Sequence, residues 1–165
     1  MIPVRTGIGY DCHRFAFGRP LILGGIRLEH DRGLDGHSDA DALTHAIIDA
    51  MLGACALGDI GEHFPDTDPR FAGVDSIELL ILTEALLGVA GFEVVNIDAT
   101  VVLERPKLAP VRDQMRSRLA QALSLELSDV SVKATRGEGM GFVGREEGIA
   151  ALAVVTVRAR NAEPA

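Results

Sequence analysis

The chain contains no tryptophan, and aromatic residues make up only 4% of its 165 residues. Its hydrophobic core must therefore be built mainly from Ala, Val, Leu and Ile. Hydrophobic residues reach 47% of the chain and charged residues 24%. This composition is typical of a globular protein and differs from that of disordered or membrane proteins.

Cysteine is scarce as well. Cys12 and Cys55 have neither the spacing of a paired metal motif nor the number needed for a disulfide framework. The sequence also lacks an apolar run of 18 residues and a recognisable targeting segment, so we expect no membrane span. Together these absences predict a protein of a reducing, cytoplasmic compartment.

Positive charge is in the minority, with 16 basic against 24 acidic residues and a net charge of −8. Such a chain lacks the basic surface with which proteins bind nucleic acids or anionic membranes. If the ligand is an anion, its charge must be neutralised locally. Metal ions and a few cationic side chains would have to do so.

Length and hydrophobic periodicity predict one domain over residues 1–158, followed by a flexible tail at residues 159–165. The predicted helices cover residues 39–54, 75–90 and 110–123, and the predicted strands cover residues 2–14, 93–104, 129–135 and 148–157. Gly24 and Gly25 predict the turn of a hairpin. The last strand is apolar enough to be buried on both faces. The pattern is that of an α/β or α+β domain.

Four of the five histidines lie in the stretch from Asp11 to His45. If the first strand ends at residues 9–14, Asp11 and His13 point to the same face and can share one metal ion. Cys12 would then point toward the core as a small apolar residue.

The last histidine of this stretch, His45, lies on the predicted helix that follows. Ser38 and Asp41 predict a capping box at the start of this helix. Apolar residues recur along one side of the helix, and His45 is expected to project from the other side. Asp41 or Asp49 would hold the second ring nitrogen of His45 and fix its tautomer.

Asp11, His13 and His45 together supply the three oxygen and nitrogen ligands that leave the fourth position of a zinc ion open. Taken singly, each of these residues is more often an ordinary surface or core residue. Their clustering within one short stretch favours a metal site.

Two loops carry further candidate residues. The segment 56–73 is rich in Gly, Pro and Asp, and its acidic residues Asp59, Asp66 and Asp68 fit either function or simple turn chemistry. The segment 136–148 holds five glycines together with Glu138, a candidate ligand for a hard divalent cation. Lys107 is suited to meet a phosphate, although a solvated loop lysine is the alternative. The combination indicates metal-assisted phosphoryl transfer or hydrolysis.

A set of motifs in a fixed order makes this interpretation more specific. It comprises DCH at residues 11–13, GHSDAD with His45 behind it, LGDIGEHFPDTD, RPKL, and KAT followed by GFVGREEG. Over residues 5–158 this order resembles the 2-C-methyl-D-erythritol 2,4-cyclodiphosphate synthase family. The resemblance implies an α+β domain whose mixed β-sheet is covered by helices on one face. It also implies a homotrimer in which the sheets pack together and the active sites lie between subunits.

The implied enzyme is a phosphorus–oxygen lyase of isoprenoid precursor biosynthesis by the non-mevalonate pathway. It would cyclise 4-diphosphocytidyl-2-C-methyl-D-erythritol 2-phosphate to 2-C-methyl-D-erythritol 2,4-cyclodiphosphate and release CMP. A metal-dependent phosphohydrolase is the alternative, because it would use the same metals with water as the nucleophile. A third reading is a non-catalytic trimeric ligand-binding protein with a structural zinc ion.

The resemblance also implies roles for individual residues. One Zn²⁺ per subunit would be held by Asp11, His13 and His45, and Glu138 would help to hold Mg²⁺ or Mn²⁺ at the substrate diphosphate. The implied catalytic residues are these four together with His37, Lys133 and Thr135. The implied substrate-binding residues are His37, Ser38, Asp59, Gly61, Asp66, Arg105, Pro106, Lys107, Leu108, Ala134, Thr135, Arg136, Phe142 and Arg145.

Two positions depart from the family pattern. KATRGE stands where the family usually has KATTTE, and Arg136 either contacts a phosphate bidentately in place of a threonine or turns to solvent. Ala40 stands where glycine is usual, and we expect it to be tolerated in the first helical turn. Arg145 and Glu147 match positions near the trimer axis, where the family has an apolar channel, so an isoprenoid diphosphate is a candidate partner.

Overall fold

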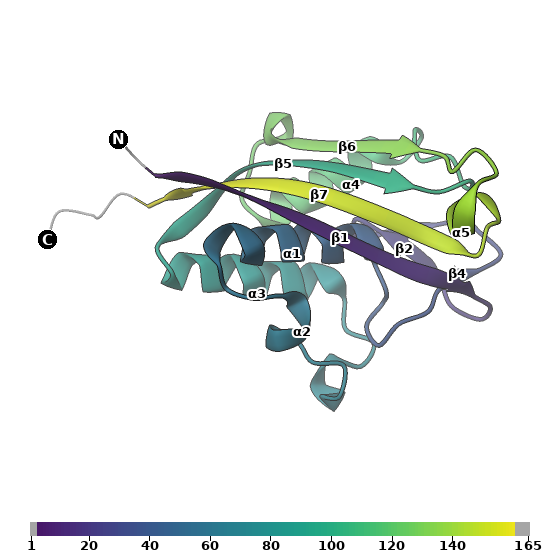
Figure 1. Ribbon diagram of the computed structural model, residues 1–165, viewed down its shortest axis with the longest axis horizontal. Coiled ribbons are helices and arrows are strands. Elements are labelled where there is room, and N and C mark those ends of the chain that lie inside the picture. Colours follow the sequence, from purple (N-terminus) through teal and green to yellow (C-terminus); the bar gives the residue numbers. More distant parts are fainter. Residues whose placement is uncertain (1–2, 161–165) are drawn as a thin grey trace, which may run out of the picture.

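Five strands form one mixed sheet in the order β4-β1-β7-β5-β6 (Figure 1). β1 (Val4–Ala16) and β5 (Phe92–Val102) both run antiparallel to the central strand β7 (Gly148–Ala159). β6 (Val130–Thr135) lies parallel to β5, and the short β4 (Gly33–Leu34) pairs with the end of β1. The sheet therefore contains both antiparallel and parallel pairs, as the predicted α+β class requires.

Helices cover one face of this sheet (Figure 1). The long ones are α1 (Ala42–Cys55), α3 (Ser76–Val89) and α4 (Arg112–Ala122). The shorter elements are the hairpin strands β2 (Leu21–Leu23) and β3 (Ile26–Leu28), the helices α2 (Ile60–His63) and α5 (Gly141–Gly144), and 3₁₀ turns at Pro69–Phe71 and Leu127–Asp129. No helix in the described part of the chain is both long and apolar enough to span a membrane.

The computed structural model describes residues 3–160. Within that range the predicted helices, strands and glycine hairpin are all confirmed, with ends that differ by a few residues. β7 extends to residue 159, one residue into the predicted tail. The remainder of that tail from residue 161 lies outside the described residues.

The start of α1 differs from the prediction. Asp41 rather than Ser38 caps the helix, because its carboxylate accepts the backbone N–H of Thr44 at 3.0 Å. Ala40 lies before the helix and not in its first turn, and its φ of 59° is in the left-handed region. The prediction that Ala40 is a helical residue was therefore wrong. Glycine would occupy this backbone conformation at lower cost than alanine.

The uncovered face of the sheet corrects two further predictions. Cys12 is exposed and does not face the core, because α1 packs against the opposite side of β1, which carries Asp11 and His13. β7 is not buried on both faces either. Leu152 is 39% exposed and Val154 is 40% exposed, whereas the residues that alternate with them are buried under the helices.

Two glycines let β1 and α1 approach each other closely. A side-chain carbon added at Gly9 would overlap the backbone oxygen of Ala46, and one added at Gly7 would overlap that of Ala50. Both contacts are with backbone, which cannot turn aside as a side chain can. This approach brings the helix residue next to Ala46, which is His45, close to the strand residues that follow Gly9.

We therefore predict that Gly9→Ala lowers the free energy of unfolding by about 3 kcal/mol or more, because the helix and strand must separate. Gly53→Ala is the matched control, since an added carbon there lies 3.9 Å from its nearest neighbour. Gly53 is exposed within α1, so alanine should stabilise the chain by about 1 kcal/mol. Urea unfolding of both variants measures the difference. Equal stabilities would contradict the close approach.

Candidate functional site

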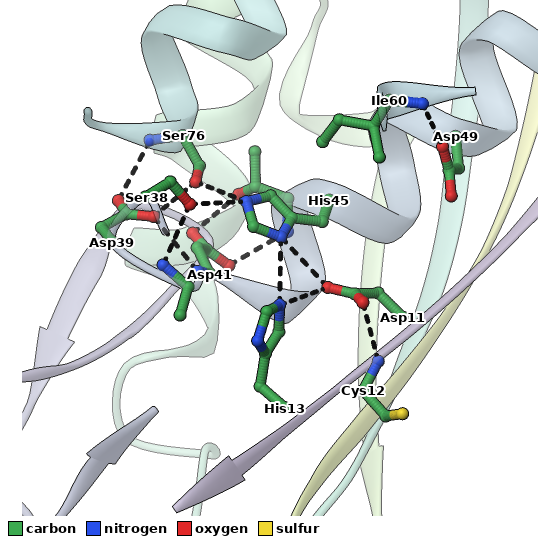
Figure 2. Close-up of polar contacts among 12 residues, drawn as sticks. Asp11, Cys12, His13, Ser38, Asp39, Asp41, His45, Asp49, Ile60 and Ser76 are labelled. Carbon is green, nitrogen blue, oxygen red and sulfur yellow. Dashed lines mark hydrogen bonds and ion pairs between the residues drawn. The ribbon is translucent and has the colours of Figure 1, made fainter. Parts of the chain in front are cut away.

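Asp11, His13 and His45 form a cluster of three donor groups whose ligand atoms all lie within 4.8 Å of one another (Figure 2). Oδ2 of Asp11 lies 2.8 Å from Nε2 of His13 and 3.1 Å from Nδ1 of His45. The two ring nitrogens are 3.3 Å apart. In the described residues no other group of three such side chains converges in this way.

The positions of the three side chains follow from local structure. Strand alternation places Asp11 and His13 on one face of β1, as predicted, and this face is the one that the helices cover. His45 comes from α1 and is itself buried, with 9% of its surface exposed. The sequence predicted that His45 would project from an exposed side of α1. The helix has almost no exposed side, because all of its residues except Asp49 and Gly53 are buried.

The second ring nitrogens are held by groups that the sequence did not indicate. Nδ1 of His13 lies 2.6 Å from the backbone oxygen of Asp35. Nε2 of His45 lies 2.9 Å from Oγ of Ser76 and 3.1 Å from Oγ of Ser38. Each histidine therefore presents its other nitrogen to the cluster.

The prediction that Asp41 or Asp49 holds His45 was wrong, because both carboxylates are engaged elsewhere. Asp41 accepts the backbone N–H groups of Gly24 and Gly25 at 2.9 and 2.7 Å, which attaches the hairpin turn to the start of α1. Asp49 accepts the N–H of Ile60 at 2.8 Å and so fixes the start of α2.

The cluster fits a metal ion such as zinc. Since Nδ1 of His13 donates to a carbonyl, its Nε2 is the nitrogen that faces the carboxylate and the other ring, and it offers a lone pair there when the ring is neutral. Tetrahedral zinc with ligands at about 2.0–2.1 Å holds neighbouring ligand atoms about 3.3 Å apart. The distances of 2.8, 3.1 and 3.3 Å are close to that spacing.

The electrostatics of the cluster favour a cation as well. Burial alone would raise the pKa of Asp11, but the hydrogen bonds and charges of His13 and His45 outweigh it and hold that pKa far below its usual range. Burial alone would lower the pKa of His13, and its hydrogen bond to Asp11 outweighs this effect and raises the pKa. Asp11 therefore remains a carboxylate and attracts positive charge to this point.

A cavity of about 450 Å³ opens beside the three donors. It is lined by several of the residues predicted from the sequence, namely His37, Ser38, Gly61 and Asp66, and by the apolar residues Ile60, Phe64, Phe71 and Leu79. Asp59 does not line the cavity but caps α2 by accepting the N–H of Glu62 at 3.0 Å. The cavity thus combines a charged wall with an apolar one, as sites for polar organic ligands do.

Arg19 supports the loop that carries His37. Its guanidinium donates to the backbone oxygens of Gly36 and Ser38, both at 2.5 Å. These two residues flank His37 in the chain, so Arg19 holds the backbone on both sides of it. Nothing in the sequence indicates this role, because an arginine 18 residues upstream resembles any other surface cation.

A second cavity of about 650 Å³ lies where β5 and β6 end. Most of its lining residues were predicted, namely Arg105, Pro106, Lys107, Leu108, Ala134, Thr135 and Arg136, and it is completed by His30, Leu103, Glu104 and Ala109. Lys133 is not among them. Its ammonium lies 2.6 Å from the carboxylate of Asp98 on the neighbouring strand.

The glycine-rich segment carries the remaining predicted residues. Glu138 has a φ of 52° and pairs with Arg136 at 3.2 Å. Phe142 and Arg145 line a third cavity of about 800 Å³, whose wall also includes His13. Glu138 is thus separate from the three-donor cluster, and a metal ion at this residue would need further ligands from a bound molecule and from water.

The model of the YgbB family matches residues 4–158. The 2-C-methyl-D-erythritol 2,4-cyclodiphosphate synthase of Syntrophobacter fumaroxidans is 58% identical over 155 residues, which cover 94% of this chain and 98% of the relative. The synthase of Thermosynechococcus vestitus is 59% identical over 158 residues, with 96% and 98% covered.

A solved structure of a 2C-methyl-D-erythritol-2,4-cyclodiphosphate synthase in its CDP-bound form is also similar. It superposes with a TM-score of 0.85 at 37% identity and covers 93% of this chain and 99% of that one. Both the fold and the order of the motifs are therefore shared with these proteins.

The contacts of Arg19 lead to a prediction about the loop beside the cluster. Arg19→Met removes two charge-assisted hydrogen bonds, together worth roughly 2 kcal/mol or more, and should speed amide hydrogen exchange of residues 36–38 by about thirtyfold. Arg70→Met is the control, because Arg70 is exposed and its guanidinium contacts only residues close in sequence, Asp68 and Phe71. Mass spectrometry of peptides spanning residues 34–40 measures the effect. Exchange at the wild-type rate in Arg19→Met would refute the supporting role.

Proposed function

The chain belongs to the YgbB family, and from that membership we propose that it is a cyclising phosphorus–oxygen lyase that releases CMP. The substrate is 4-diphosphocytidyl-2-C-methyl-D-erythritol 2-phosphate, and the product is 2-C-methyl-D-erythritol 2,4-cyclodiphosphate. The relatives with 58–59% identity are 2-C-methyl-D-erythritol 2,4-cyclodiphosphate synthases. The family resemblance in the sequence is confirmed by these relatives.

The reaction forms one phosphorus–oxygen bond and breaks another. An oxygen of the 2-phosphate attacks the β-phosphorus of the same molecule, and the bond from that phosphorus to the bridging oxygen breaks. CMP leaves with this oxygen and its electron pair. No enzyme nucleophile is required, so the chain's contribution is to hold both phosphates in line and to offset their negative charge.

The observation that carries the proposal is the cluster of Asp11, His13 and His45 on the wall of a cavity that His37 and Ser38 also line. These three residues would hold a zinc ion, which supplies a Lewis acid for a phosphate oxygen when bound. Ser38 and the imidazole of His37 would bind the methylerythritol phosphate. Asp66 would accept hydrogen bonds from the erythritol hydroxyls.

The second cavity would take the cytidine and the diphosphate. Its volume of about 650 Å³ and its mixed lining suit a nucleotide, and one of the similar solved structures contains CDP. Lys107 and Thr135 would contact phosphate oxygens. Glu138 would help to hold Mg²⁺ or Mn²⁺, which would supply positive charge for the diphosphate.

The uncovered face of the sheet supports a homotrimer. Ile8 pairs with Val154 and Tyr10 with Leu152 in the register of β1 and β7, so the four side chains form one apolar patch. Ile8 is 71% exposed and Tyr10 53% exposed in the single chain. Exposed apolar patches of this kind favour association, and trimeric packing would bring a donor cluster of one subunit toward the nucleotide cavity of the next.

We predict that the purified chain with Mg²⁺ converts the substrate to a cyclic diphosphate and an equal amount of CMP. Phosphorus NMR follows the product, and ¹⁸O-labelled water separates cyclisation from hydrolysis. A phosphohydrolase would incorporate the label, whereas cyclisation should not. An open monophosphate product or label in the product would refute the proposal.

We also predict that His45→Ala lowers CMP release by at least about a hundredfold, since one of three metal ligands is lost. Light scattering tests the assembly in parallel. Unchanged assembly with lost turnover supports the enzyme. Loss of the trimer would favour the reading of a non-catalytic protein with a structural zinc ion.

The apolar patch leads to a further prediction. Ile8→Glu places a charge in the proposed interface and should convert the trimer to a monomer without CMP release. Val89→Glu is the matched control, because Val89 is 91% exposed at the end of α3, away from the sheet face. Sedimentation equilibrium measures both masses. A trimer of Ile8→Glu would contradict this interface.

A further inference from the structure

A chain of hydrogen bonds runs from His45 away from the metal cluster to a buried serine and then to a carboxylate (Figure 2). Nε2 of His45 lies 2.9 Å from Oγ of Ser76. The hydroxyl of Ser76 donates to Oδ1 of Asp39, and the backbone N–H of Ser76 donates to Oδ2 of the same carboxylate at 3.0 Å. Ser76 is fully buried, so water does not compete for these contacts.

The direction of these bonds determines where the proton of His45 lies. A carboxylate only accepts hydrogen bonds, so the single hydroxyl proton of Ser76 is directed at Asp39. The oxygen of Ser76 can then only accept from His45, and it does so when the proton of the imidazole is on Nε2. In that tautomer Nδ1 of His45 presents a lone pair to the cluster.

A second carboxylate opposes this arrangement. Oδ2 of Asp11 lies 3.1 Å from Nδ1 of His45 and, without a metal ion, attracts the imidazole proton to that nitrogen. A ring with its proton on Nδ1 cannot bind a metal through Nδ1. Asp11 thus favours the Nδ1–H tautomer of His45, whereas Ser76 and Asp39 favour the Nε2–H tautomer.

We propose that Asp39 and Ser76 are positioning residues, which hold His45 in the Nε2–H tautomer and so keep Nδ1 free for the metal ion. This role deepens the proposed function and rests on it for its catalytic meaning. Asp39 precedes the cap of α1, whereas Ser76 is the first residue of α3. The tautomer of His45 therefore depends on how the start of α3 packs against the loop before α1.

Ser38 provides an internal comparison. Its Oγ lies 3.1 Å from Nε2 of His45 and accepts the backbone N–H of Ala40 at 3.2 Å. No carboxylate accepts its hydroxyl proton in the structure, so this proton can rotate toward Nε2 or away from it. Ser38 is therefore compatible with either tautomer of His45, whereas Ser76 is compatible only with the Nε2–H tautomer.

The test begins with ¹⁵N-histidine NMR of the full chain free of metal, with the His45 signals assigned by comparison with His45→Gln. We expect the wild type in the Nε2–H tautomer. Ser76→Ala should shift the proton toward Nδ1, whereas Ser38→Ala should shift it less. A wild-type ring with its proton on Nδ1, or equal tautomers in wild type and Ser76→Ala, would overturn the proposal.

Zinc affinity provides the second measurement, by competition with a chromophoric chelator. Ser76→Ala and Asp39→Asn should each weaken zinc binding by about 10- to 100-fold. Because Asp39 acts through Ser76, Asp39→Asn should have almost no further effect in the Ser76→Ala background. Additive effects of the two substitutions, at temperatures where all variants remain folded, would overturn the relay.

Neither measurement requires turnover, so the two proposals can fail separately. A wild-type chain that binds zinc as expected but releases no CMP would refute the cyclisation and leave the relay intact. Normal CMP release with unaltered zinc affinity in Ser76→Ala would refute the relay alone.

Discussion

The close approach of β1 to α1 is the constraint on which the rest of the site depends. Glycines at two alternate strand positions allow backbone to contact backbone, so α1 lies nearer the sheet than a helix with ordinary neighbours can. Asp11 and His13 follow these glycines on the same face of the strand. At this separation an imidazole from the helix reaches the carboxylate of the strand directly, and the three donors converge without a connecting loop.

The loop before α1 is the second element that the site needs, and it is held from several directions. Arg19 holds its carbonyls, Asp39 ties it to the start of α3, and Asp41 joins it to the β2–β3 hairpin. The left-handed conformation of Ala40 sits within this network. Backbone strain of this kind persists where surrounding contacts impose it, and here those contacts also orient His37 and Ser38.

The donor cluster and the cavity at the ends of β5 and β6 are formed by different parts of the chain. This separation makes chemical sense for the proposed reaction. A substrate with three phosphorus atoms requires its charge to be neutralised at more than one point, yet the chain carries a net charge of −8. In the proposed reaction, metal ions and a few cations such as Lys107 would supply positive charge locally without changing that balance.

The sequence by itself determined the elements, the order of the motifs and the identity of the three donors. Alternation along β1 and periodicity along α1 are local properties, and they sufficed to place Asp11 and His13 on one face and to assign His45 to a helix. The cap at Asp41 and the burial of β7 were misjudged, because they depend on which face of each element meets a neighbour. Local patterns do not contain that information.

The partners of the donors were decided by the tertiary structure alone. Ser76 lies 31 residues from His45 and Arg19 lies 17 from Gly36, and nothing in either local sequence marks these residues. They reach the site because α3 and the segment after β1 are packed around the start of α1. Hydrogen bonds between distant segments arise from packing geometry, so only the folded chain shows which nitrogen of each histidine remains free to bind a metal ion.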